Sequence, residues 1–270
     1  MLKCRVQSGT RAHLSNFRKY SAYYDLLYSD KNYEAEADYV ARSLLVARPG
    51  VRTILELGSG TGRHGRLLAD RGFGVHGVER SAEMVAVAEA RGDDGATGAG
   101  RFGCQVGDIC DLQLGRRFDA VIALFHVISY QTSNDALLAV FRNAAEHLEQ
   151  GGVFLFDVWH GPAVLTQRPS KRTREVSDRS IRVKRTATPM LDTNRATVEV
   201  VYEMECANLT NGEVSRFKET HVMRYLFPTE IDLLARASGM RCERVEEFLT
   251  GQPPSTENWG VSYLLRKAER

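Results

Sequence analysis

The sequence contains few cysteines and no long apolar run. Its 270 residues include 5 cysteines, none of them in C-x-x-C spacing, so neither a disulfide framework nor a cysteine-bound zinc site is predicted. No stretch approaches the roughly 18 apolar residues that a membrane-spanning helix needs. The N-terminal segment is basic and lacks an apolar region, which disfavours a secretory signal and favours a mobile arm, with an organelle transit peptide as the alternative. We therefore expect a cytoplasmic protein with reduced thiols and no membrane contact.

The sequence also lacks an excess of charge of either sign. Lys and Arg number 36 against 34 Asp and Glu, which gives a net charge of +2. A dedicated nucleic-acid-binding protein usually shows a basic excess or stripe, so no nucleic-acid partner is expected. No spaced group of His, Asp and Glu predicts a metal site. The 43% of hydrophobic residues suffices for one large domain, or for one domain with a sizeable insertion.

The first half of the chain alternates short apolar strands with helical segments. This alternation predicts a parallel sheet with helices on both faces, because strands buried on both sides are almost continuously apolar. Ser81 is a good N-cap for the third of the helices. The predicted strands span residues 53–57, 73–78, 102–106, 118–124 and 153–157, and the predicted helices span residues 33–46, 65–70, 82–90 and 135–148.

The second half follows a different pattern. Residues 171–225 alternate apolar and polar side chains with period two, and Asn211-Gly212 is a strong hairpin-turn signal. A helix at residues 228–238 and strands at 241–249 and 259–266 follow. We predict an α/β fold: a Rossmann-like, doubly wound, mostly parallel seven-stranded sheet with an antiparallel β insertion. The predicted domains are an N-terminal arm and cap (1–35), a ligand-binding domain (36–160 with 226–270), and the insertion (161–225), which forms the acceptor side or a dimer surface.

The glycine-rich stretch ILELGSGTGRHG, residues 54–65, is the main functional signal. Gly60, Gly62 and Gly65 satisfy G-x-G-x-x-G, and glycines between a strand and a helix let the backbone approach a ligand closely. Glu79 ends the next strand, where an acid accepts hydrogen bonds from ribose hydroxyls. These features fit NAD, FAD and S-adenosylmethionine equally.

Two acids separate these three cofactors. Glu56 lies in the first strand, just before the glycines, where a dinucleotide would place its anionic pyrophosphate, and two like charges in a cleft repel. A cofactor with an ammonium and a sulfonium group there would instead be attracted. Asp108 and Ile109 follow the third strand and place an acid and an apolar side chain at the same crevice. S-adenosylmethionine is therefore the favoured cofactor, and a dehydrogenase is the minor alternative.

The ordered motifs ILELGSGTGRHG, GVHGVERSAEMVAVA, QVGDICDL, FDAVIALFHVISY and LEQGGVFLFDVW together resemble class I S-adenosylmethionine-dependent methyltransferases. The resemblance covers roughly residues 20–160. The segment YYDLLYSDKNYEAEADYV, the β insertion and ETHVMRYLFPTEIDLLARASG further resemble the small-molecule branch, which includes N,N-dimethyltransferases of nucleotide-linked amino sugars.

The resemblance implies a set of cofactor-binding residues. Glu56 would hold the methionine amino group, Glu79 the ribose diol and Asp108 the adenine amino group. Gly58, Gly60 and Gly62 would carry the backbone beneath the cofactor. Arg80, Met84 and Ile109 would flank the adenine, and Leu124 would line the methionine side.

Catalytic and acceptor-binding candidates lie after the strands and in the N-terminal cap. Methyl transfer needs an in-line approach and the exclusion of water, and a base only where the acceptor must lose a proton. His126 and Tyr130 follow the fourth strand, where the resemblance places a histidine, and Tyr130 aligns closer to it. A cluster of tyrosines in the cap also offers hydroxyls. The catalytic candidates are Tyr130, His126 and Tyr24, and the acceptor-binding candidates are Tyr28, Trp159, His221 and Arg224, the last as a phosphate clamp.

We therefore expect a small-molecule methyltransferase, with a nucleotide-linked amino or hydroxyl sugar of secondary-metabolite or surface-polysaccharide biosynthesis as the acceptor. No N/D-P-P-Y/F stretch follows the fourth strand, which disfavours the nucleobase and glutamine amine methyltransferases that carry it. An O-methyltransferase of another metabolite and a non-catalytic module that binds the cofactor or a partner are the alternatives. A homodimer formed through the insertion is a further expectation.

Overall fold

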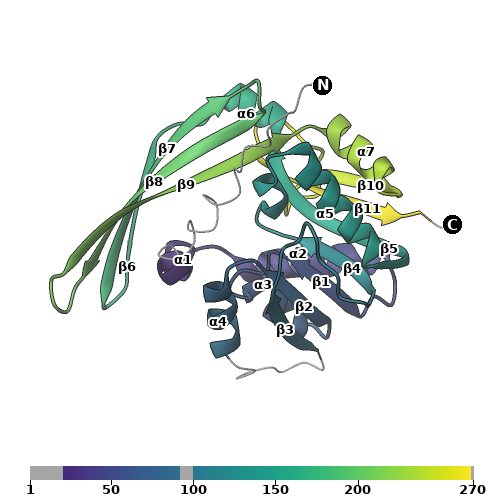
Figure 1. Ribbon diagram of the computed structural model, residues 1–270, viewed down its shortest axis with the longest axis horizontal. Helices are drawn as coiled ribbons and strands as arrows, with labels where there is room; N and C mark the ends of the chain where they lie inside the picture. Colours follow the sequence, from purple (N-terminus) through teal and green to yellow (C-terminus); the bar gives the residue numbers. More distant parts are fainter. Residues whose placement is uncertain (1–20, 92–99, 269–270) are drawn as a thin grey trace, which may run out of the picture. The chain divides into compact units, whose positions relative to one another are not determined.

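The computed structural model describes residues 21–91 and 100–268 of the chain (Figure 1). Tyr20 and most of the predicted arm lie outside the described residues. The chain divides into two compact units. The ribbon unit comprises the described part of Met1–Asp30 together with Lys171–Thr188 and Val200–His221, and the sheet unit comprises Lys31–Ser170, Pro189–Glu199 and Val222–Arg270. The domain boundaries predicted from the sequence stay a prediction.

The strands form one 11-stranded sheet, in which β5 pairs in parallel with β9 (Val214–Leu226) at its end, and seven of these strands make up the Rossmann-like part. The strand order is β3-β2-β1-β4-β5, and these neighbours pair in parallel. β11 pairs antiparallel with β5, and β10 pairs antiparallel with β11. The predicted Rossmann-like, mostly parallel seven-stranded sheet is therefore confirmed. The strands are β1 (Thr53–Leu57), β2 (Gly74–Glu79), β3 (Arg101–Val106), β4 (Phe118–Ala123), β5 (Leu148–His160), β10 (Met240–Glu247) and β11 (Gly260–Lys267).

Helices connect these strands, and local signals account for their ends. The side chain of Ser81 caps α4 by accepting a hydrogen bond from the amide of Met84, as the sequence predicted. Gly239 follows α7 with φ of +70°, the left-handed conformation that ends helices. The helices are α2 (Tyr33–Ala47), α3 (Arg63–Asp70), α4 (Ala82–Ala90), α5 (Asn134–Glu146), α6 (Gly161–Gln167) and α7 (Pro228–Ala237), with a short 3₁₀ helix, η2, at Val127–Tyr130.

Three short helices were not predicted from the sequence. α1 (Ser21–Leu27), η2 and α6 span only one or two turns, too few residues to show a helical period. The first pair of α6, Gly161-Pro162, is itself a turn signal, and the helix follows β5 without a linker. Tertiary packing, and not the local sequence pattern, therefore makes these segments helical.

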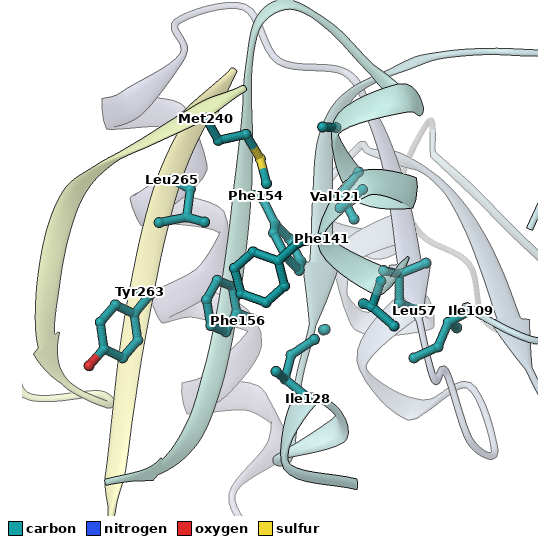
Figure 2. Packing of buried hydrophobic residues seen from close by; sticks show 14 of the residues in the cluster. Leu57, Ile109, Val121, Ile128, Phe141, Phe154, Phe156, Met240, Tyr263 and Leu265 are labelled. Atoms are coloured by element: carbon teal, nitrogen blue, oxygen red, sulfur yellow. The ribbon is translucent and has the colours of Figure 1, made fainter. Parts of the chain in front are cut away.

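The core of the sheet unit lies on both faces of the sheet. Successive β5 residues alternate between two buried clusters, with Phe154 and Phe156 in one and Val153 and Leu155 in the other. Figure 2 shows Phe154 and Phe156 packed with Phe141 of α5, and their ring centroids lie 5.7 and 5.3 Å from that of Phe141. Burial on both faces explains why the parallel strands read as continuous apolar runs.

The predicted β insertion forms four strands in the order β9-β8-β7-β6. Consecutive strands are neighbours joined by short turns, an arrangement that only antiparallel pairing allows. Gly212 has φ of +74° and confirms the Asn211-Gly212 turn. Leu27 packs with Val183, Met204 and Cys206 in the small core of the ribbon unit. The strands are β6 (Arg172–Ser177), β7 (Ile181–Asp192), β8 (Thr197–Asn208) and β9 (Val214–Leu226), and the last three run through both units.

Across residues 21–91 and 100–268, the longest helices fall short of the length and apolarity that a transmembrane span requires.

Candidate functional site

The glycine loop joins β1 to α3 and has a backbone that glycine fits best. Gly58, Gly60 and Gly62 have φ values of +70°, +54° and +74°, in the region that side chains disfavour. A Cβ on Gly58 would also lie 2.6 Å from a methyl carbon of Val127. The loop is held against β2, because the amide of Gly58 donates to the carbonyl of Val78 at 2.8 Å.

Glu56, in β1, is a buried carboxylate beside this loop. Its Oε2 has no hydrogen-bond partner among the residues that the structure describes. Burial, together with the nearby carboxylate of Glu79, raises the pKa of Glu56 to about 8. A Cβ on Gly65, in the first turn of α3, would lie 2.6 Å from that oxygen. An unpaired buried acid with a raised pKa favours a cationic ligand, which would stabilise its charged form.

Glu79 ends β2 and fastens the glycine loop from the other side. Its Oε2 accepts from the amide of Gly60 at 3.0 Å, and its Oε1 accepts from the amide of Ser81 at 2.8 Å. Burial raises the pKa of Glu79, and these backbone donors offset part of the increase. Arg80 Nε lies 3.8 Å from Asp108 Oδ2, just beyond β3. The polar groups thus gather at the carboxyl ends of neighbouring parallel strands, where open α/β sheets bind ligands.

The three apolar cofactor candidates are all buried. Met84 lies beside the loop, since its sulfur is 4.0 Å from where a Cβ on Gly60 would be. Ile109 and Leu124 belong to the two core clusters. Core packing accounts for Ile109 and Leu124, and the cofactor contacts of all three side chains stay predictions.

His126 follows β4 and is paired with Asp157 of β5. Its Nδ1 lies 2.6 Å from Asp157 Oδ2, and its backbone amide donates to both carboxylate oxygens at 3.2 Å. Burial alone would raise the pKa of Asp157, but the contacts with His126 and the charge of Lys31 hold it below its usual range. Asp157 is therefore an ionised, buried carboxylate directly beside a predicted catalytic side chain.

A second polar cluster surrounds Lys31, just before α2. Its Nζ contacts the carboxylate of Glu36 and lies 4.4 and 4.3 Å from the ring centroids of Tyr33 and Phe125. Glu36 Oε2 is also 2.6 Å from His64 Nε2. Burial lowers the pKa of Lys31, and Glu36 offsets part of that decrease. Burial likewise lowers the pKa of His64.

Trp159 lies next to His126, and Trp259 lies next to Trp159. The ring of Trp159 is 6.2 Å from that of His126 and 5.3 Å from that of Trp259, in edge-to-face arrangements. Both indoles are half-buried, and the backbone amide of Trp159 donates to Ser129 Oγ at 3.1 Å. Tyr130, at the end of η2, is exposed. The structure thus brings together two of the predicted residues, His126 and Trp159.

Arg224 makes contacts within the sheet unit that tie three elements together. Its guanidinium contacts the carboxylate of Glu230 in α7 and donates to Asn134 Oδ1, at the start of α5, at 2.8 Å. These contacts give Arg224 a structural role. The phosphate clamp stays a prediction.

The remaining candidates lie in the ribbon unit. The rings of Tyr24 and Tyr28 are 4.8 Å apart, and Tyr28 Oη accepts from Arg185 at 3.0 Å. His221 is buried, with its ring 4.9 Å from that of Tyr202. The ribbon unit therefore contains a compact tyrosine, arginine and histidine cluster, and the roles predicted for Tyr24, Tyr28 and His221 stay predictions.

Several residues of this site were missed by sequence reasoning. Asp157 had the same signal as Glu56 and Glu79, an acid at the end of a predicted parallel strand, and that signal could have identified it. Lys31, His64 and Trp259 had none, because only the tertiary fold brings them to the strand ends.

The chemistry of these residues fits S-adenosylmethionine. The unpaired oxygen of Glu56 suits the ammonium of its methionine part, Glu79 suits vicinal hydroxyls, and the positive φ values of the loop leave room for a ligand close to the backbone. When bound, S-adenosylmethionine supplies an electrophilic methyl group on a positively charged sulfur. A pyrophosphate would instead meet the Glu56 carboxylate.

Comparisons with known proteins agree with this chemistry. A sequence model of the methyltransferase domain matches residues 54–152. A dTDP-3-amino-3,4,6-trideoxy-alpha-D-glucopyranose N,N-dimethyltransferase of Streptomyces venezuelae is 29% identical over 232 residues, which cover 85% of this chain and 93% of that protein. A dTDP-3-amino-3,6-dideoxy-alpha-D-glucopyranose N,N-dimethyltransferase of Streptomyces fradiae is 34% identical over 145 residues, about half of each chain.

Among solved structures, the sugar N-methyltransferase KedS8 from a Streptoalloteichus species superposes with a TM-score of 0.75 at 26% identity, covering 91% of this chain and 93% of the other. The resemblance to class I methyltransferases of the sugar N,N-dimethyltransferase kind is confirmed. The chain is an S-adenosylmethionine-dependent methyltransferase, and S-adenosylmethionine is its cofactor.

Proposed function

We propose that this S-adenosylmethionine-dependent methyltransferase methylates the amino group of a nucleotide-linked amino sugar. The observation that carries the proposal is the extent of the likeness to the Streptomyces venezuelae sugar N,N-dimethyltransferase, which spans 93% of that relative. This likeness extends well beyond residues 54–152, so it includes regions outside the donor-binding motifs. Biosynthesis of a secondary metabolite or a surface polysaccharide is the setting that this acceptor class suggests.

The residues of the sheet unit would divide the work between donor and acceptor. Glu56 binds the methionine ammonium, Glu79 accepts from the ribose hydroxyls, and the glycine loop carries the donor at the ends of β1 and β2. His126 follows β4 and Trp159 lies near the end of the neighbouring strand β5, where the acceptor would bind. An amine is nucleophilic only when unprotonated, so the site needs close positioning, exclusion of water and a place for one proton.

A panel of matched acceptors tests this proposal. The purified full chain is incubated with S-adenosylmethionine and either a dTDP-linked amino sugar or the same sugar with a hydroxyl in place of the amine. We expect mass spectrometry to show addition of one and then two methyl groups to the amino sugar, and none to the hydroxyl sugar.

Other outcomes point to the alternatives. Methylation of the hydroxyl sugar alone would overturn the amine assignment and favour an O-methyltransferase. Binding of S-adenosylhomocysteine in calorimetry, without transfer of labelled methyl to any acceptor in a metabolite extract, would favour a non-catalytic module.

A further inference from the structure

Asp157 and His126 form a pair in which the carboxylate is buried and the imidazole is half-buried. His126 follows β4 and Asp157 lies in the adjacent parallel strand β5, where Phe156 pairs with Ala123 of β4. Asp157 is 1% exposed, and burying a carboxylate in this way is costly unless donors satisfy it. His126 supplies its backbone amide, which donates to the carboxylate at 3.2 Å, and its ring Nδ1 lies 2.6 Å from Asp157 Oδ2.

The backbone at this point is strained. Phe125 and His126 both have φ of +64°, a conformation that non-glycine residues rarely adopt and that concentrates at functional sites. This conformation turns the His126 amide toward the carboxylate to which its ring is also bound. The two contacts together fix the orientation of the imidazole.

The pairing also bears on where the imidazole carries its proton. An ionised carboxylate only accepts hydrogen bonds, so a carboxylate oxygen 2.6 Å from Nδ1 favours the neutral tautomer that has its proton on Nδ1 and its lone pair on Nε2. Nδ1 is itself buried, whereas 22% of the His126 side chain is exposed. The accessible part of the ring is therefore away from Asp157, beside the half-buried Trp159.

We propose that Asp157 is a positioning residue that holds His126 with Nε2 unprotonated, ready to take the proton released when the acceptor amine is methylated. This inference rests on the proposed function. As the amine nitrogen forms its bond to the methyl carbon, the carbon–sulfur bond of the donor breaks and its electron pair stays on sulfur. The proton lost from nitrogen passes to His126 Nε2, and the resulting imidazolium is stabilised by Asp157.

Other charged groups lie near Asp157 and His126, and their charges affect how the pair responds to pH. The charge of Lys31, before α2, helps to keep Asp157 ionised. His64 of α3 interacts with both Lys31 and Asp157. Lys31 is in turn bound to Glu36. The Asp157–His126 pair therefore responds to one cation and one further histidine, and variants of the pair must be compared at several pH values.

Nitrogen-15 NMR of the histidine-labelled full chain tests the positioning directly. The imidazole nitrogens of His126 are assigned with a His126→Gln variant. We expect a protonated Nδ1 and an unprotonated Nε2 in the neutral ring, and loss of that preference in Asp157→Asn. A wild-type ring protonated at Nε2 would overturn the proposal, whatever the acceptor proves to be.

Kinetics give a second readout. In Asp157→Asn we expect kcat with the amino sugar to fall by roughly 10- to 100-fold, and the pH profile of kcat/KM to change, because the imidazole is no longer held in one tautomer and orientation. The dissociation constant of S-adenosylhomocysteine stays unchanged. An unaltered pH profile would show that Asp157 is merely structural.

His147→Gln is the matched histidine control. His147 is buried between Asn143 and Leu114, with Nδ1 and Nε2 both in backbone contacts, so its loss should lower stability and leave the pH profile in place. If Asp157→Asn does not fold, Asp157→Glu replaces it, because this variant keeps the carboxylate and should retain the wild-type pH profile of kcat/KM. The NMR measurement on the wild-type protein still tests the proposed tautomer. Failure of all amino sugars as acceptors would refute the proposed function without affecting the tautomer measurement.

Discussion

Three acids of the same kind end up with different properties because their surroundings differ. Glu56 is buried with an unpaired oxygen and has a pKa raised to about 8. Glu79 is held by the amides of Gly60 and Ser81. Asp157 is bound by His126, and its pKa is lowered despite burial. The first is complementary to a cation, the second presents carboxylate oxygens beside the glycine loop, and the third already has its partner.

Glu79→Ala is expected to weaken S-adenosylhomocysteine binding by roughly 10- to 100-fold, because hydrogen bonds to a charged group contribute about 1.5–3 kcal/mol. The loop also loses its anchor at Gly60. Titration calorimetry measures the change. Glu79→Gln, which keeps one acceptor oxygen, should lie between the two proteins, and wild-type affinity in Glu79→Ala would contradict the ribose assignment.

At the scale of the element, the first turn of α3 packs so closely at Gly65 that there is no room for a side chain. A Cβ on Gly65 would lie 2.3 Å from the ring of Phe102 and 2.6 Å from Glu56 Oε2. The loop, β3 and the buried carboxylate of β1 therefore meet at one glycine. The last glycine of the G-x-G-x-x-G motif serves close packing here, not a left-handed turn, because its φ is not positive.

Gly65→Ala is expected to destabilise the protein by about 1–3 kcal/mol, the usual cost of overpacking, although alanine is the better helix former. It should also weaken cofactor binding by displacing Glu56. Urea unfolding and calorimetry check the two effects. Gly103→Ala is the matched control, because a Cβ there meets nothing within 4 Å, and equal behaviour of the two variants would contradict this packing.

At the scale of the whole molecule, the raised pKa of Glu56 makes the stability of the fold depend on pH. Its pKa is about 8 in the folded chain against an ordinary value of 4.5, so the folded state keeps a proton that the unfolded state has lost. The contribution of Glu56 to stability is therefore fully present below about pH 4.5 and is lost progressively as pH rises toward 8. A cationic cofactor opposes this loss by stabilising the ionised form.

Glu56→Gln is expected to remove this pH dependence. Between about pH 6 and pH 8 the wild-type protein should lose up to roughly 1.4 kcal/mol of unfolding free energy per pH unit relative to the variant. Urea unfolding of both proteins isolates the effect, because His64 and His160, whose pKa values are lowered by burial, titrate in both. Parallel curves would show that Glu56 is already ionised in the free protein.

The predicted homodimer is a further question at this scale. The insertion supplies β6 as the edge of its sheet, and an edge strand has unpaired backbone groups that can bind a second chain. The dimer stays a prediction.

Local patterns in the sequence suffice to predict the parallel sheet, the glycine loop and the acids at the strand ends. These depend on signals that are local in the chain: apolar runs, glycine conformations and the strand-end positions of Glu56, Glu79 and Asp108. Such signals can be recognised in the sequence because backbone sterics and burial on both faces act within a few residues.

The contacts between side chains of the sheet unit depend instead on the tertiary structure. It paired His126 with Asp157, brought Trp259 to Trp159, and placed Lys31 against Phe125. It also bound Arg224, predicted as a phosphate clamp, to Glu230 and Asn134. These contacts join residues far apart in the chain, and their partners depend on strand order and register, which no local pattern encodes.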